Sequence, residues 1–281
     1  MSAAFSALVA ALLGSGAREN IVALLFSTRL DETGTDGRSP YTVIAGAVAL
    51  PAMWDDLGMS WKRLLSRSHV KAFHTKEFQD RHEGFEGWSD FKAKRFTQAQ
   101  EKIVGKHSFF TVAVGVDRAA HAAIKKEMVG IKGFKADSDY GLCFRMLMMA
   151  VCGEVMKTNP TAKVAFMLES GAAGAEDAAL IYKSVKHMTG PREPSRHAHM
   201  LGGFALVEKE DCVTLEAADF IAGQSIVGLT AKGFRSREKH LSVFVDTDVL
   251  RLWHKGMLDE KERRRAYHKA KKGVPSGAQP S

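Results

Sequence analysis

Cysteine is scarce in this sequence, and no long apolar run occurs in it. Three cysteines do not make a disulfide framework. Cys143 and Cys152 lie nine residues apart on one predicted helix, about 13 Å of helix rise, which is too far for a disulfide. We therefore predict reduced, mostly buried thiols in a reducing compartment. No stretch approaches the roughly 18 apolar residues of a membrane helix, so we predict a cytoplasmic protein without a membrane partner.

The common catalytic motifs are also missing. The sequence has no GxxxxGK[ST] phosphate loop, no GxSxG elbow and no HExxH zinc motif. The segment DETGTDG at 31–37 departs from the calcium loop of an EF-hand, because it lacks the closing glutamate. It does resemble the DxGT turn of actin-like ATPases. An ATP-dependent phosphotransferase therefore stays open as an alternative, although only one such turn is present.

Positive charge is concentrated at the C-terminus. The formal net charge is +8, and residues 255–281 contain eight basic and three acidic residues. This tail would attract a polyanion such as nucleic acid. The alternative is a solvated terminus that aids solubility.

Strand-like and helix-like segments alternate along most of the chain. The apolar runs at 21–30 and 41–50 flank the turn-rich segment 31–40, which predicts an antiparallel hairpin. Later strands at 109–116, 164–168 and 203–208 alternate with helices, the last of which covers 215–230. This order predicts an α/β protein with a mixed sheet and helices on both faces.

Three regions are predicted. Residues 1–17 are apolar and small, with no Lys or Arg before the apolar stretch, so we expect residues 1–20 to form a short helix or extension; a signal peptide is the alternative. Residues 21–254 contain no convincing linker and form one domain. Residues 255–281 form the basic, partly disordered tail.

Several acidic residues lie beside or within apolar segments that would be buried in a globular core. Asp31 follows one apolar strand and Glu169 follows another, while Glu216 and Asp219 interrupt an apolar helix. Glu216 and Asp219 are three residues apart, so they share a helix face. If that face meets the ends of the two strands, the four carboxylates converge, and such a cluster needs bound metal or raised pKa values.

We predict that Asp31, Glu169, Asp219 and Glu216 bind Mg²⁺ or Mn²⁺, as two ions about 4 Å apart. Carboxylate oxygens favour these hard cations over zinc. Each acid has another interpretation: Asp31 as a turn residue, Glu169 as a loop cap, and Asp219 as the partner of a buried hydrogen bond or of an Arg or Lys.

His74 and Glu77 form a further candidate pair. A helix would place both on one side, where His74 would act as a proton shuttle or outer ligand. A surface turn is the alternative. Glu32, directly after Asp31, is a candidate auxiliary ligand or water orienter together with Glu216.

These residues resemble the motifs of the bacterial and phage family catalogued as domain of unknown function 3800. The shared features are the Asp31-Glu32-Thr33-Gly34 turn, Phe73-His74 with Glu77, and the segment LEAADFIA at 215–222. In between, Tyr140 matches the tyrosine near which a family helix opens. The resemblance covers roughly residues 22–230, and it departs at Glu169, where the family has Asp, and at Glu216, where it has Gln.

The resemblance implies a ribonuclease H-like fold and a nuclease role. Together with the acids and the basic tail, it leads us to predict Asp31, Glu169, Asp219, Glu216, Glu32 and His74 as catalytic residues. We therefore expect a divalent-metal-dependent hydrolase of phosphodiester bonds with nucleic acid as its partner. The alternative is a non-catalytic module that binds nucleic acid or protein on the same fold.

Overall fold

The computed structural model describes residues 25–34, 39–129, 136–172, 174–187, 198–230, 240–252 and 255. The predicted extension at 1–20 and all but the first residue of the predicted tail at 255–281 lie outside these residues. The described residues divide into two compact units, one within Met1–Val116 and Asp137–Phe244, the other within Asp117–Ala136 and Val245–Ser281. The predicted division into one domain with an extension and a tail stays a prediction.

The larger unit is built on a six-stranded sheet whose strand order is β5-β4-β1-β2-β3-β6. Antiparallel β1 and β2 form the predicted hairpin, while β4 pairs in parallel with β1 and β5 in parallel with β4. The predicted mixed sheet of an α/β fold is thereby confirmed. The strands are β1 Leu25–Thr33, β2 Tyr41–Ala49, β3 Phe110–Asp117, β4 Lys163–Glu169, β5 Leu201–Val207 and β6 His240–Val245.

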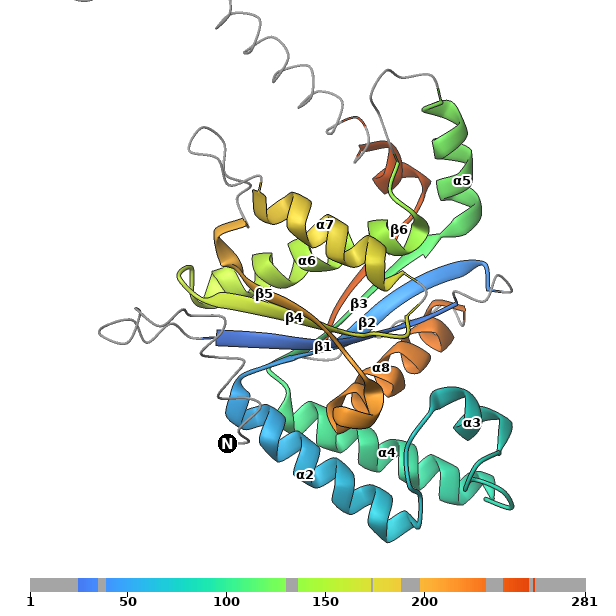
Figure 1. The fold of residues 1–281 in the computed structure, drawn as a ribbon. Helices are drawn as coiled ribbons and strands as arrows, with labels where there is room; N and C mark the ends of the chain where they lie inside the picture. Colours follow the sequence, from blue (N-terminus) through green and yellow to red (C-terminus); the bar gives the residue numbers. More distant parts are fainter. Residues whose placement is uncertain are drawn as a thin grey trace, which may run out of the picture. The chain divides into compact units, whose positions relative to one another are not determined.

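Helices cover both faces of this sheet, as predicted. On one side lie α2, α3, α4 and α8, and on the other lie α6 and α7 (Figure 1). These helices are α2 Pro51–Ser68, α3 Thr75–Asp80, α4 Asp90–His107, α6 Asp139–Thr158, α7 Ala175–His187 and α8 Val213–Thr230. The smaller unit contains α5, Arg118–Glu127. Short 3₁₀ turns occupy Ala198–Met200 and Lys209–Asp211.

Strand β2, in the middle of the sheet, is buried on both of its faces. Val43, Ala45, Ala47 and Ala49 belong to the core cluster formed with α2, α4 and α8, while Ile44, on the opposite face, is also fully buried. A strand covered on both sides needs apolar residues at every position, which is what the segment at 41–50 provides. The small alanines also let α8 pack closely against the sheet.

Several predicted boundaries differ from the structure. The last predicted helix, at 215–230, is α8, which begins two residues earlier at Val213. Asp31 lies inside β1 and does not follow it, because β1 extends to Thr33. The strand at 203–208, read as the last clear one, is β5, and β6 follows it after α8. Cys143, Cys152 and Cys212 are free thiols, as predicted.

Candidate active site

Three neighbouring strands deliver polar side chains to one edge of the sheet. Leu30 of β1 is in register with Leu168 of the parallel strand β4, so Asp31 and Glu169 follow side by side. Glu169 is in turn in register with Val207, the last residue of β5, and Lys209 comes two residues later. The carboxyl ends of parallel strands meet at one edge, which is where open α/β sheets bind ligands.

Helix α8 brings the third carboxylate, Asp219, to the same place. The Thr75 amide donates a hydrogen bond to Asp219 Oδ2 over 3.2 Å, and its hydroxyl donates to the Asp219 carbonyl over 2.9 Å. Gly223, one turn further along α8, permits this approach, because a Cβ there would lie 2.2 Å from Cγ2 of Thr75. The start of α3 therefore holds Asp219 in place.

The ammonium of Lys209 lies among all three carboxylates. Its Nζ atom is 2.8 Å from Asp219 Oδ2, 3.3 Å from Asp31 Oδ2 and 3.5 Å from Glu169 Oε2. The Lys209 side chain is only 10% exposed, and Glu169, at 26%, is the most exposed of the three acids. Residues from β1, β4, the turn after β5 and α8 thus form one cluster, which we call the Lys209 cluster.

The acids of the Lys209 cluster are incompletely compensated. Burial raises the pKa of Asp31 to about 7; the Lys209 charge opposes this rise, and the charges of Asp219 and Glu169 add to it. Burial alone would lower the pKa of Lys209, but the three carboxylates raise it above its ordinary value. One ammonium facing three acids leaves an excess of negative charge in a site shielded from water.

Tyr140, at the start of α6, borders the cluster. Burial raises the pKa of its phenol, and the charges of Glu32 and Asp31 raise it further. The loop after β4 packs closely on the ring, since a Cβ on Gly174 would lie 2.1 Å from Cγ of Tyr140. The phenol therefore stays protonated and is fixed beside the carboxylates.

Glu216 is directed elsewhere. Its Oε2 atom accepts hydrogen bonds from Nε1 of Trp61 and from the amide of Phe73, both over 3.0 Å. Burial raises the pKa of Glu216, and these two hydrogen bonds oppose the rise. In this arrangement Glu216 joins α8 to α2 and to the segment before α3, and it does not contact Lys209 directly. Its predicted role as a metal ligand stays a prediction.

The remaining candidates occupy the rim. His74 lies directly before α3, with Nδ1 3.8 Å from Asp219 Oδ2 and a side chain that is 40% exposed. The amide of Glu32 donates a hydrogen bond to Asp31 Oδ1 over 2.7 Å, while its own side chain is partly exposed. Glu77 lies in the first turn of α3. His74 thus adjoins the cluster from the solvent side.

Lys209 is the site residue that the sequence interpretation missed. It lies in a polar segment, Glu208 to Asp211, which is typical of an exposed loop. The available signal was its position directly after a predicted strand, together with the alternative interpretation of Asp219 as the partner of a buried basic residue. That alternative describes the observed contact between Lys209 and Asp219.

Among the described residues, no group of three or more His, Cys, Asp or Glu side chains is arranged to hold a metal ion. No helix in the described part of the chain is long and apolar enough to cross a membrane.

Comparison with known proteins adds only distant likenesses. No protein-family model matches the chain, and no curated protein matches it. The crystal structure of Bst-RNase HIII in complex with Mn²⁺ is similar over 80% of this chain and 64% of its own, with 13% identity and a TM-score of 0.42. A mutant of Bst-RNase HIII is similar over 75% of this chain and 54% of its own, with 11% identity and a TM-score of 0.40.

This chain therefore spans less than two thirds of the length of those two structures. Likeness at this level assigns no function to the chain. The fold class rests on the strand order and strand directions of the sheet, and the chemistry of the site rests on the Lys209 cluster.

Proposed function

We propose that this chain is a nuclease that hydrolyses phosphodiester bonds in nucleic acid with the help of Mg²⁺ or Mn²⁺. The observation that carries the proposal is the convergence of Asp31, Glu169 and Asp219 within 3.5 Å of one ammonium group. These acids come from two adjacent strands and a distant helix. A folded protein gains no stability from burying like charges together, so their meeting indicates a site for a cation.

The donor set fits a hard divalent cation. Asp31, Glu169 and Asp219 offer carboxylate oxygens, which Mg²⁺ and Mn²⁺ prefer. The pKa of Asp31 rises to about 7, chiefly through burial and against the attraction of Lys209, so Lys209 alone does not satisfy the acids. These three residues would hold the ion. A second ion would need Glu32 or a reoriented Glu216 as additional ligands.

A bound divalent cation would lower the pKa of a water molecule and neutralise negative charge on the phosphate. The protein residues supply the rest. Lys209, with three N–H donors, is placed to donate hydrogen bonds to an anionic phosphate oxygen at the same edge. His74, half-exposed beside Asp219, is placed to deliver a proton to the leaving oxygen. Tyr140 contributes a neutral hydrogen-bond donor.

The sequence resemblance gains support from this geometry. Asp31, His74 and Asp219 come from three separate motifs of the family known as domain of unknown function 3800, and they meet around one point. We propose that the chain is a member of that family and that its partner is nucleic acid. Its predicted cytoplasmic location is untested by the structure.

A second candidate is a non-catalytic binding module. Lys209 favours this alternative, because its ammonium lies within ion-pair distance of all three acids. In that case the Lys209 cluster would be a structural ion-pair network, and metal would not bind.

A cleavage assay separates the two candidates. The purified chain is incubated with Mn²⁺ and single-stranded, duplex and RNA–DNA hybrid oligonucleotides, alongside Asp31→Asn, Asp219→Asn and the exposed-acid control Asp55→Asn. We expect cleavage by the wild type and the control, and a loss of at least 100-fold in the two site variants, typical of removing a residue that stabilises the reacting charge. Equal cleavage by all variants would exclude this site.

Calorimetric titration with Mn²⁺ supplies a second measurement. We expect binding to the wild type and to Asp55→Asn, and much weaker binding to Asp31→Asn. No Mn²⁺ binding by the wild type would favour the non-catalytic module.

A further inference from the structure

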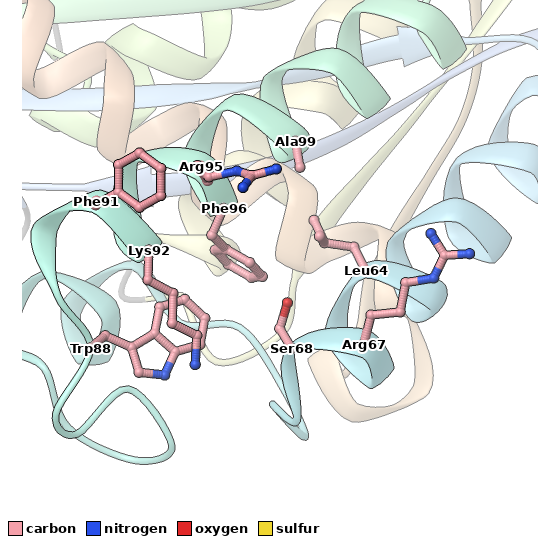
Figure 2. Close-up of a pocket in the computed structure, with 9 residues that line it drawn as sticks. All are labelled: Leu64, Arg67, Ser68, Trp88, Phe91, Lys92, Arg95, Phe96 and Ala99. Carbon is pink, nitrogen blue, oxygen red and sulfur yellow. The ribbon is translucent and has the colours of Figure 1, made fainter.

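A surface pocket lies between α2 and α4, built from residues outside the Lys209 cluster. Its volume is about 440 Å³, and Figure 2 shows its lining from α2, α4 and the segment directly before α4. The lining residues include three cations and three aromatic side chains, and no acid: Arg67, Lys92, Arg95, Trp88, Phe91 and Phe96. All of these residues belong to the larger unit.

The cations of this pocket lie next to aromatic rings. The ammonium of Lys92 is 3.8 Å from the centroid of the Trp88 ring, and the guanidinium carbon of Arg95 is 5.8 Å from that of Phe91. Asp90, directly before Phe91 in the sequence, is paired with Arg81 over 3.5 Å and does not line the pocket, and neither does Glu86. The positive charge of the lining is therefore not neutralised by a carboxylate within it.

The aromatic rings differ in how they are held. Trp88 contacts the rings of Phe85 and Phe96 edge-on, each at a centroid distance of 5.2 Å, so its position is fixed by the core. Phe91, by contrast, is 70% exposed and is not one of the buried residues of the core. Because the Lys92 ammonium lies over the Trp88 ring, the exposed Phe91 ring is the accessible aromatic surface beside these cations.

We propose that this pocket binds single-stranded nucleic acid, with a base stacking on the exposed ring of Phe91 and phosphates contacting Arg67, Lys92 and Arg95. Sequence-tolerant binders of single strands combine these two features, a cationic path for the backbone and aromatic side chains for the bases. An acidic peptide would use the cations but would leave the Phe91 ring, which is 70% exposed, in contact with water. The inference deepens the proposed nuclease function by assigning a strand-binding site apart from the Lys209 cluster.

The test measures binding without cleavage. A fluorescein-labelled single-stranded oligonucleotide of about ten nucleotides is titrated with the full chain in EDTA, and anisotropy is recorded at several salt concentrations. The variants are Phe91→Ala, Lys92→Ala and Arg95→Ala. Lys94→Ala is the matched control, because Lys94 is an exposed cation on the same helix that does not line the pocket.

We expect Phe91→Ala to weaken binding by about five-fold or more, as loss of one stacked base does. Lys92→Ala and Arg95→Ala should each weaken binding and lower the salt dependence by about one phosphate contact, whereas Lys94→Ala should change neither. Phe91 is exposed, so its replacement leaves folding intact, which a circular dichroism melt checks.

Three outcomes would overturn the inference. They are no oligonucleotide binding at low salt, equal losses in Lys92→Ala and Lys94→Ala, or displacement of the oligonucleotide by an acidic peptide at equal charge concentration. Asp31→Asn separates this inference from the proposed function, since it should abolish cleavage and leave binding in EDTA unchanged. Binding that is weakened in Phe91→Ala, without cleavage by any protein, would uphold the pocket and refute the nuclease. Cleavage and binding that are both unchanged in Phe91→Ala would uphold the nuclease and refute the pocket.

Discussion

Lys209 and Asp219 lie ten residues apart in sequence, and their side chains meet at 2.8 Å beside the ends of β1 and β4. The turn after β5 and the second turn of α8 are thereby joined next to Asp31, which Lys209 also contacts. The contact gives the site its counter-charge and keeps the three acids together. Its removal is the most direct way to learn what the Lys209 cluster contributes.

We predict that Lys209→Met lowers the free energy of unfolding by about 3 kcal/mol near pH 8, because removing one partner leaves buried carboxylates uncompensated. The loss should shrink near pH 5, where Asp31 is protonated. Urea denaturation measures both. Lys157→Met is the control, since Lys157 pairs with Glu154 at the surface with 74% of its side chain exposed.

If the acids bind metal, added Mn²⁺ should restore most of the stability lost in Lys209→Met, because the cation replaces the ammonium. A Lys209→Met protein as stable as the control at both pH values would contradict the assigned role of the ammonium.

The raised pKa of Asp31 predicts a pH dependence of stability. Burial raises this pKa from 3.8 to about 7 in the folded chain. Between these values the unfolded chain binds fewer protons than the folded chain, so the free energy of unfolding falls as pH rises through that interval. The pKa of Lys209 is raised from a value that is already high, so Lys209 does not titrate there.

We therefore predict that Asp31→Asn is more stable than the wild type near pH 8, by up to about 4 kcal/mol, and gains nothing near pH 4. Thermal or urea unfolding across pH 4 to 8 gives the difference, with Asp55→Asn as the exposed control. A constant difference between Asp31→Asn and the wild type across this range would show that Asp31 does not titrate as proposed.

The two hydrogen bonds of Glu216 predict a structural role that a pair of variants can test. Glu216→Gln keeps an acceptor oxygen for Trp61 and Phe73, so it should change stability by less than about 1 kcal/mol. Glu216→Ala leaves both buried donors without their acceptor and should cost about 2–4 kcal/mol. Urea denaturation distinguishes them.

Calorimetric titration of Glu216→Gln with Mn²⁺ addresses the sequence prediction that Glu216 is a ligand. Unchanged affinity is expected from the observed geometry. A large loss of affinity would instead show that Glu216 turns toward the metal.

The loop after β4 supplies a further prediction. Gly174→Ala should destabilise the chain by about 2 kcal/mol or more, because the added Cβ would lie 2.1 Å from the Tyr140 ring and must displace it. Gly171→Ala, in the same loop, meets no atom within 4 Å and should be near neutral. Thermal unfolding of the two variants makes the comparison, and equal melting temperatures would contradict the close packing on Tyr140.

The sequence by itself determined the mixed α/β sheet, because apolar runs with turn residues between them report which segments are buried. It also indicated that Asp31, Glu169 and Asp219 are unusual, since acids at strand ends and in an apolar helix carry a desolvation penalty wherever they lie. Both properties are local, and a linear pattern records them.

Only the tertiary structure decided which side chains meet. Glu216 and Asp219 share a face of α8 in sequence terms, yet Glu216 turns to Trp61 while Asp219 turns to Lys209. The pairing of β4 with β1 and β5 sets that difference, because it fixes where the turn carrying Lys209 lies. Contacts between residues far apart along the chain depend on sheet order, and no local pattern encodes that order.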